Sequence, residues 1–264
     1  MNLELHGKTA VVSGSTAGIG LAIATALAEE GAAVVVNGRT AARVAAAEEG
    51  IRRKVKGAQL RGVAADLGTA GGAVELARQA PEADILVNNL GIYAAKPFAE
   101  ITDAEWMHIF EVNVMSGVRL TRHYLPGMLR QNWGRVIFIS SESGQHIPPE
   151  MVHYGMTKTA QIAVARGIAE GVAGTGVTVN SVLAGPTASE GVANFVADMA
   201  KQRSLTPAQV EKDFFTTVRP SSLLKRFETP EEVAAVVAFV ASPRSTAING
   251  AAVRAEGGVV QSIF

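Results

Sequence analysis

The sequence contains no cysteine, which excludes disulfide bonds, thiol catalysis and thiolate metal ligands. It also lacks an excess of either charge, because Lys plus Arg and Asp plus Glu each number 24. This balance removes the electrostatic argument for nucleic acid or an anionic membrane as a partner. No apolar run approaches the roughly 20 residues that a membrane-spanning helix needs. Residues 1–6 lack the basic and then apolar pattern of a secretory signal, so we expect a soluble, cytoplasmic protein.

Short, β-rich apolar segments alternate with longer Ala-rich segments along almost the whole chain. This alternation is typical of an α/β fold and predicts a doubly wound parallel sheet of seven strands with helices on both faces. One domain over residues 1–264 can hold such a sheet, since α/β folds often exceed the usual domain length without splitting. The predicted strands cover residues 9–13, 33–37, 59–65, 84–88, 135–140, 177–183 and 250–255. The main predicted helices cover residues 19–30, 41–55, 103–130, 152–173 and 230–241.

Residues 185–227 form the irregular part of the sequence, with two short helical patterns and no predicted strand. Because this segment is long for a connection in a compact domain, we expect a substrate lid. Its apolar side chains either cover a hydrophobic substrate or only pack the short amphipathic helices. These side chains are Val192, Phe195, Val196, Met199, Phe214, Phe215 and Val218.

A glycine-rich turn follows the first predicted strand and opens the first predicted helix. It reads Ser13-Gly14-Ser15-Thr16-Ala17-Gly18-Ile19-Gly20. Its glycines allow a tight turn and let a pyrophosphate approach the helix N-terminus, where free amides and the helix dipole favour anions. The glycine spacing differs from the commoner dinucleotide fingerprint, and such turns also occur for geometry alone. The turn predicts a cofactor-phosphate site made of Gly14, Ser15, Thr16, Gly18, Ile19 and Gly20.

The second predicted strand is followed by Gly38 and Arg39, at the position where a dinucleotide fold recognises the adenosine ribose. An acidic residue there accepts hydrogen bonds from the 2′-hydroxyl group, whereas Arg pairs with a 2′-phosphate. Since this strand end has no acid, Arg39 favours NADP(H) over NAD(H). The alternative is a solvated residue at a helix start that serves solubility.

Two further strand ends lie at the carboxyl edge, where open α/β sheets bind ligands. Asp66 and Leu67 follow the third strand and are predicted to line the adenine pocket, although an Asp there is equally often a turn former. Asn89 and Gly91 follow the fourth strand and are predicted cofactor contacts. The alternative is that the Asn side chains only tie neighbouring loops together.

Tyr154 and Lys158 are four residues apart on a predicted helix, so their side chains share a face. A free Tyr titrates near pH 10, but an adjacent ammonium favours the phenolate and lowers that pKa toward the range of a useful acid and base. For an isolated match, an ordinary surface pair is the better interpretation. The context adds Ser141, which lies just beyond the fifth strand, and Asn113, which needs a partner because Asn is a mediocre helix former.

With these residues in order, the chain resembles the classical short-chain dehydrogenase/reductase family over nearly all its length. The family's glycine motif and its Asn-Asn-x-Gly motif match the two turns described above, and its catalytic tetrad matches Asn113, Ser141, Tyr154 and Lys158. The spacing is close to that of bacterial 3-oxoacyl-acyl-carrier-protein reductases of this family. The resemblance implies a Rossmann-like fold and hydride transfer between a nicotinamide cofactor and a carbonyl or secondary alcohol, with no metal.

The resemblance also implies a role for each tetrad residue. Tyr154 acts as the acid and base, and Ser141 hydrogen-bonds the reacting oxygen. Lys158 binds the nicotinamide ribose as well as lowering the Tyr154 pKa, so both residues also contact the cofactor. Asn113 holds a water in a proton relay to Lys158.

After the sixth strand the chain departs from the family's usual Pro-Gly, with Gly185-Pro186-Thr187 and then Ser189 in the aligned segment. These four residues are still expected to contact the nicotinamide amide. Ser189 replaces a frequent Thr, and Thr187 is a possible substitute for it.

The expected partner is a small carbonyl or alcohol substrate, and the resemblance implies a homo-oligomer, either tetramer or dimer. Two other functions stay open. One is a cofactor-binding sensor or scaffold without chemistry, against which the intact tetrad argues. The other is an epimerase or dehydratase on the same fold, which would recycle bound cofactor.

Overall fold

The computed structural model describes residues 2–189, 192, 196–197, 200–201 and 205–263. Seven parallel strands form one sheet in the order β3-β2-β1-β4-β5-β6-β7, which confirms the predicted sheet. Their ends differ from the predicted ones by at most two residues. The strands are β1 Thr9–Val12, β2 Ala33–Gly38, β3 Leu60–Ala64, β4 Ile85–Asn88, β5 Gly134–Ser141, β6 Val177–Ala184 and β7 Ala252–Ala255.

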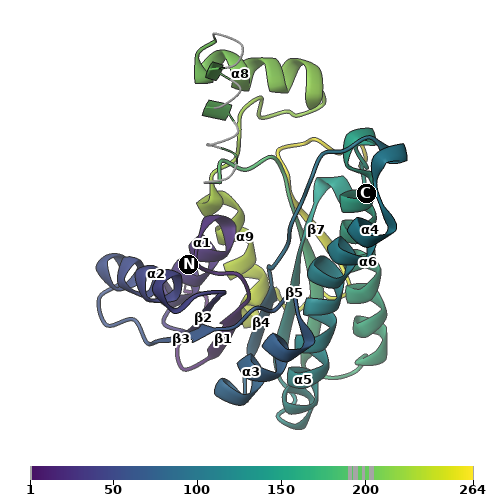
Figure 1. Ribbon diagram of the computed structural model, residues 1–264. Helices are drawn as coiled ribbons and strands as arrows, with labels where there is room; N and C mark the ends of the chain where they lie inside the picture. The colour runs from purple at the N-terminus through teal and green to yellow at the C-terminus, as the bar shows by residue number, and fades with distance from the viewer. Residues whose placement is uncertain (1, 190–191, 193–195, 198–199, 202–204, 264) are drawn as a thin grey trace.

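Helices cover both faces of this sheet, as Figure 1 shows. One layer contains α1, α2 and α9, whose apolar residues share a core cluster. The other contains α3, α5 and α6. The helices are α1 Gly18–Glu29, α2 Ala41–Lys54, α3 Ala70–Gln79, α4 Asp103–Phe110, α5 Ser116–Arg130, α6 Val152–Gly171, α8 Pro207–Asp213 and α9 Pro230–Ala241.

The two core clusters follow directly from the two-residue period of a strand. In β5, Ile137 and Ile139 pack in the layer of α1 and α9, whereas Val136 and Phe138 pack in the layer of α5 and α6. Successive strand side chains point to opposite faces, and a parallel sheet covered on both faces needs apolar residues at every position. This is why the central strands appear as continuous apolar runs rather than as alternating patterns.

The chain first moves outward through β1, β2 and β3 and then returns to place β4 beside β1. At such a reversal, the loops that follow neighbouring strands diverge to opposite faces and leave a crevice at the carboxyl edge. The loops after β1 and β4 lie at this crevice. They are the glycine turn and the segment that begins with Asn89.

The helix predicted over residues 103–130 contains an irregularity that the sequence pattern did not reveal. A π-helical turn, Glu111–Met115, separates α4 from α5, and Asn113 lies at its centre. Thr102 caps the start of α4 in a reciprocal capping box with Glu105. Single π turns inside α-helices often occur at functional sites.

The expected lid segment, residues 185–227, includes α8 and a second π-helical turn, Phe214–Val218. In Figure 1, α8 lies apart from the sheet, beyond the ends of α1 and α9. Phe214, Phe215 and Phe227 form a ring cluster with centroids 5.0–5.1 Å apart, so part of the apolar content packs the segment itself. Phe195 and Met199 lie outside the described residues, as do residues 190–191, 193–194, 198 and 202–204.

Within the described ranges, every helix is too short or too polar to span a bilayer.

Candidate functional site

The four residues of the predicted tetrad come from three elements that meet at the carboxyl edge of the sheet. Ser141 ends β5, Asn113 lies in the π turn, and Tyr154 and Lys158 occupy successive turns of α6. The Lys158 Nζ atom is 5.5 Å from the centroid of the Tyr154 ring. The fold therefore places a phenol, an ammonium and a hydroxyl in one region.

Lys158 is buried and makes two hydrogen bonds inside the protein. Its Nζ donates to the carbonyl oxygen of Ile139 at 2.9 Å and to Oε1 of Gln161 at 3.2 Å. Burial disfavours the charged ammonium and lowers the pKa of Lys158 to about 8, while the nearby Glu142 carboxylate acts in the opposite direction. The lysine is therefore poised to exchange a proton near neutral pH.

Tyr154 is partly exposed, and its ring packs edge-on against Tyr93 with centroids 6.2 Å apart. Burial of the phenol raises the pKa of Tyr154, and the Glu142 carboxylate adds to this, while Ser141 and Arg219 lower it. Burial and Glu142 outweigh the groups that lower the pKa of Tyr154, and Lys158, which was expected to lower it, is not among those groups. Tyr154 is thus a proton-bearing phenol at neutral pH.

Ser141 donates a short hydrogen bond to the carboxylate of Glu142 and accepts one from the Ser143 amide at 3.2 Å. The adjacent Ser140 faces the other way, and its hydroxyl donates to the Lys158 carbonyl oxygen at 2.8 Å. Ser140 therefore ties β5 to α6. This division of roles fits the choice of Ser141 as the serine that faces the substrate.

Asn113 is fully buried, and its side chain is held on three sides. Its Oδ1 accepts from the Ile92 amide at 2.8 Å, and its Nδ2 donates to the Ile92 carbonyl oxygen at 2.9 Å and to the Thr157 hydroxyl at 3.0 Å. Its own carbonyl oxygen accepts from Nε2 of Gln161 at 2.7 Å. Gln161 therefore links Asn113 to Lys158.

The glycine turn has the backbone geometry that its sequence predicts. Gly14 and Gly18 have φ values of 61° and 54°, in the left-handed region that favours glycine. A Cβ atom on Gly20 would lie 2.4 Å from the Gly14 carbonyl oxygen and 2.4 Å from Nδ2 of Asn89. The tight packing of the turn therefore leaves no room for a side chain at position 20.

The N-terminus of α1 fits an anionic group. Its first amides have no acceptor within the helix, and in the described structure neither a capping side chain nor an acidic first-turn residue covers them. An uncovered helix start with flanking glycines is the donor set that a pyrophosphate requires. Ser15, Thr16 and Ile19 lie in or beside this turn, although the Ser15 hydroxyl is already bonded to Val12 and Asn37.

Asn89 ties the two loops of the crevice together. Its Nδ2 donates to the carbonyl oxygens of Ser13 and Gly14 at 3.0 and 3.1 Å, which is the alternative role that its sequence context left open. The Ser13 hydroxyl accepts from the amides of Asn89 and Leu90. Gly91 lies so close to Lys158 that a Cβ atom would be 3.4 Å from Nζ.

The remaining predicted adenosine contacts lie at the ends of β2 and β3. Arg39 is exposed and lies directly after β2, at the position predicted to recognise the ribose. Asp66 is exposed and accepts from the Gly68 amide at 3.1 Å, so it does form a turn, whereas the Leu67 side chain is buried in the core. A cofactor contact at Leu67 would therefore have to use its backbone.

Glu228 holds the loop after β6 in place. The sequence analysis did not identify this residue. Residues Thr187 and Glu228 form a parallel bridge, with the Glu228 amide donating to Pro186 O at 2.9 Å. Its carboxylate accepts from the Gly185 amide at 3.3 Å. Burial raises the pKa of Glu228 to about 7. Ser189 also belongs to this loop, and its amide bonds to Thr187 O.

We expect Glu228→Gln to stabilise the protein at alkaline pH. The pKa of Glu228 rises from 4.5 to about 7 on folding, so its stabilising contribution is present below pH 4.5 and is lost as the pH rises through 7. The loss is on the order of 3 kcal/mol above pH 7. Melting temperatures at pH 5 and pH 8 should show a gain for the variant that is larger at pH 8. The exposed Glu231→Gln is the control, and an equal shift in both variants would contradict this assignment.

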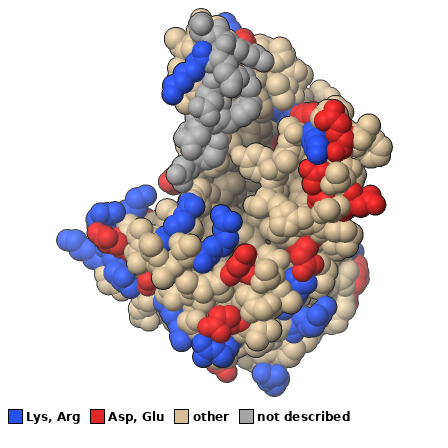
Figure 2. All heavy atoms as spheres, in the orientation of Figure 1, with Lys and Arg blue, Asp and Glu red and all other residues tan. Residues whose placement is uncertain are grey.

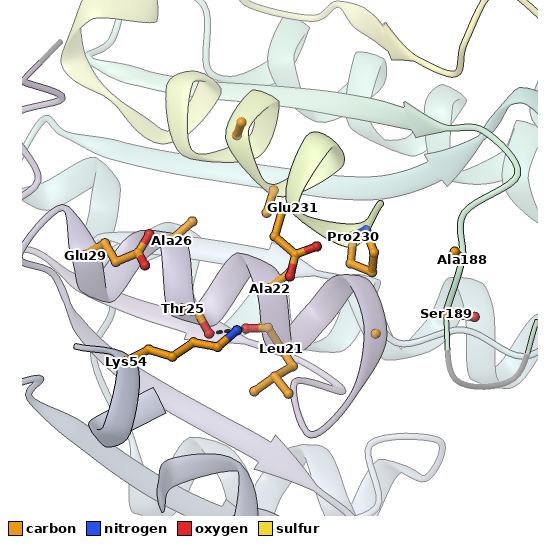
Figure 3. A pocket seen from close by; sticks show the side chains of 13 residues that line it. Leu21, Ala22, Thr25, Ala26, Glu29, Lys54, Ala188, Ser189, Pro230 and Glu231 are labelled. Carbon is orange, nitrogen blue, oxygen red and sulfur yellow. Dashed lines mark hydrogen bonds between the residues drawn. The ribbon is translucent and has the colours of Figure 1, made fainter. Parts of the chain in front are cut away.

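A separate groove of about 370 Å³ runs along the outer face of α1 and the start of α9 (Figure 3). Gly18 and Ser189 lie on its wall, but the tetrad residues do not, so the chemical assignment rests on the side chains at the sheet edge.

Figure 2 shows Lys and Arg side chains gathered over the end of the molecule that contains α2. The last turn of α2 contributes Arg52, Arg53 and Lys54.

Groups of three or more His, Asp or Glu side chains that could hold a metal do not occur within the described residues.

Several residues at this site escaped the sequence analysis. Gln161 follows Lys158 by three residues on the same helix, so helical spacing could have revealed it. Glu142 and Arg219 are 77 residues apart in sequence yet form an ion pair beside Ser141. Ser13 and Asn37 organise the glycine turn from strand ends, where their hydroxyl and amide groups resemble ordinary turn residues.

Comparisons with known proteins show which family this chain resembles. A model of the family described as short chain dehydrogenase matches residues 8–200. An uncharacterized oxidoreductase of Bacillus subtilis, YvaG, is 49% identical over 264 residues, which cover 100% of both chains. The 3-oxoacyl-[acyl-carrier-protein] reductase of Aquifex aeolicus is 32% identical over 98% of this chain and 100% of its own.

Solved structures show the same architecture. The L-sorbose reductase of Gluconobacter frateurii, solved with NADPH and L-sorbose, superposes with a TM-score of 0.93 at 30% sequence identity. The match covers 100% of both chains.

Proposed function

The chain belongs to the short-chain dehydrogenase family, and we propose from this premise that it transfers a hydride between NADP(H) and a carbonyl or secondary alcohol, with Tyr154 as acid and base. Membership makes it an oxidoreductase that uses a nicotinamide cofactor. The observation that carries the finer proposal is the convergence of Tyr154, Lys158 and Ser141 beside the glycine turn. This arrangement supplies a proton donor, its charged neighbour and a hydroxyl for the reacting oxygen.

The nicotinamide, when bound, supplies or accepts the hydride. In the reduction direction, the Tyr154 phenol protonates the carbonyl oxygen, and its raised pKa keeps that proton available at neutral pH. In the oxidation direction, the Tyr154 oxygen acts as a phenolate and takes the proton of the alcohol. Ser141 turns its O–H group, which donates to Glu142 in the structure, to the reacting oxygen and orients that oxygen.

Lys158 is proposed to stabilise the phenolate that forms when Tyr154 releases its proton, and to bind the cofactor ribose hydroxyls. Its pKa of about 8 leaves the ammonium populated at neutral pH. To reach the ribose, Nζ would exchange one of its two internal acceptors, Ile139 O or Gln161 Oε1. Asn113 holds the loop at Ile92 and, in this proposal, also a water that returns protons to Lys158.

The proposed cofactor site combines three groups of residues. The phosphates lie on the glycine turn, the adenosine lies at the ends of β2 and β3, and the nicotinamide lies between the loops after β4 and β6. These contacts are Gly14, Ser15, Thr16, Gly18, Ile19, Gly20, Arg39, Asp66, Leu67, Asn89, Gly91, Gly185, Pro186, Thr187 and Ser189.

Spectroscopic turnover of NADPH and NADH with a panel of ketones and secondary alcohols tests the proposed function. We expect oxidation of NADPH by at least one ketone, with the matching alcohol as product. Cofactor binding without turnover would indicate a sensor, and product formation without a net absorbance change would indicate an epimerase or dehydratase.

The NADPH preference is proposed to depend on Arg39. A charge-assisted contact to the 2′-phosphate contributes about 1.5–3 kcal/mol, so Arg39→Ala should raise the KM for NADPH about 10- to 100-fold and leave the KM for NADH nearly unchanged. Arg53→Ala on α2 is a matched control, because it removes an exposed charge that pairs only weakly with Glu49 at 3.4 Å. Equal losses with both cofactors would contradict the assignment of Arg39.

We also propose a cytoplasmic homo-oligomer, a tetramer or dimer, in which this single domain uses residues 185–227 as its substrate lid. Large apolar side chains near α4 support an interface, because Phe98 and Met107 are 66% and 67% exposed. Such side chains gain most from burial against a second copy.

A further inference from the structure

Beside the tetrad lies a buried ion pair that the proposed reaction does not require. Glu142 and Arg219 are 4% and 7% exposed, and the Arg219 Nε atom is 3.1 Å from Oε1 of Glu142. Glu142 directly follows Ser141, and Arg219 directly follows the π turn Phe214–Val218. The pair therefore joins the end of β5 to the segment expected to act as the lid.

A buried ion pair contributes little net free energy to the stability of a fold. Removing two charges from water costs several kcal/mol per ion, and their mutual attraction often only offsets that penalty. Buried titratable groups beside groups with perturbed pKa values are concentrated at functional sites. Glu142 also acts electrostatically on both Tyr154 and Lys158, so its carboxylate lies within the reacting region.

The hydrogen bonds of Glu142 show what its carboxylate can still accept. One oxygen takes the Arg219 Nε–H group, and the other takes the Ser141 hydroxyl. A carboxylate offers about four lone-pair positions, so each oxygen can accept a further donor. When Ser141 turns its single O–H group from Glu142 to the reacting oxygen, Oε2 of Glu142 loses a donor beside that oxygen and can accept one from a hydroxyl on the adjacent substrate carbon.

The chemistry of this position favours an uncharged hydroxyl group. Arg219 donates through Nε to Glu142, and through Nη1 to Glu150 at 3.5 Å and to the Val218 carbonyl oxygen at 3.0 Å. A carboxylate or phosphate on the substrate would stand against the like charge of Glu142, which disfavours such a substrate. A hydrocarbon would offer no donor to the Glu142 oxygen that Ser141 releases.

We propose that Glu142, held in place by Arg219, determines specificity by accepting a hydrogen bond from a hydroxyl on the carbon next to the reacting carbonyl carbon. The substrates are then uncharged hydroxy ketones and the corresponding polyols. This inference rests on the proposed function, since Ser141 must hold the reacting oxygen.

Matched ketones test the inference. We expect the wild-type enzyme to reduce hydroxyacetone with a kcat/KM at least about tenfold above that for acetone, and 1-hydroxy-2-butanone likewise above 2-butanone. Glu142→Gln should lower this ratio severalfold, because a neutral acceptor binds a hydroxyl more weakly than a carboxylate does. Glu150→Gln is the matched control. It removes the other carboxylate on Arg219 and should keep the wild-type ratio.

A double variant keeps the test independent of folding problems. Glu142→Leu with Arg219→Leu leaves no unpaired buried charge, so we expect it to fold, to bind NADPH and to show a ratio near one. An unchanged ratio in this variant, no preference in the wild type, or a preference for acetoacetate over hydroxyacetone would each overturn the inference while leaving the proposed function standing. Failure of the wild type to reduce any ketone would overturn both.

Discussion

Tyr154→Phe is expected to lower kcat for ketone reduction by about 10²- to 10⁴-fold, the usual contribution of a positioned acid or base. Phenylalanine keeps the ring and therefore its edge-on contact with Tyr93, whose centroid is 6.2 Å away. It removes only the hydroxyl that gives its proton to the substrate oxygen. The loss should thus fall on turnover rather than on folding.

Measuring NADPH binding distinguishes the loss of a proton donor from a general disruption of the site. Fluorescence titration should give the variant a dissociation constant for NADPH near that of the wild type, together with an unchanged melting temperature. Turnover within a factor of two or three of the wild type would exclude Tyr154 as the proton donor.

Gly20→Ala is expected to have the second largest effect, on cofactor binding and on stability together. The added Cβ atom would lie 2.4 Å from both the Gly14 carbonyl oxygen and Nδ2 of Asn89. Neither can move freely, because Nδ2 already bonds to Ser13 O and Gly14 O. We expect a stability loss of about 1–3 kcal/mol from overpacking. A displaced phosphate turn should also weaken NADPH binding about 100-fold.

Gly167→Ala provides a matched glycine substitution in a helix. Gly167 is exposed on α6, and a Cβ atom there would meet nothing within 4 Å. Alanine should stabilise this helix by about 0.5–1 kcal/mol and leave NADPH binding alone. If Gly20→Ala binds NADPH as well as Gly167→Ala does, the glycine turn does not hold the phosphates.

Much of the fold follows from local sequence patterns. The strands are short apolar runs rich in β-branched residues, and their burial on both faces makes each run continuous. Their order in the sheet follows from the chain reversal that brings β4 beside β1. The glycine turn could be predicted because Gly14 and Gly18 need left-handed backbone conformations.

The contacts that complete the site depend on tertiary structure, and the sequence pattern could not supply them. Glu142 and Arg219 meet only because the segment after α8 returns to the end of β5. The sequence around Asn89 is compatible with a cofactor contact and with a side chain that joins two loops. Its two hydrogen bonds to the glycine turn show that it joins the loops. The π turn was missed because a single wide turn barely disturbs the apolar period of residues 103–130.

Because of that wide turn, the number of residues around Asn113 determines where its side chain lies. A π turn accommodates one residue more than regular α-helix does, so deleting Val114 from Glu111–Met115 would let α4 and α5 merge into a straight helix. Every residue before the deletion would then rotate by about 100° relative to α5. The repaired helix would gain regular hydrogen bonds but carry Asn113 away from Ile92 and Gln161. The extra residue of the π turn thus places Asn113 where the Gln161 side chain can link it to Lys158.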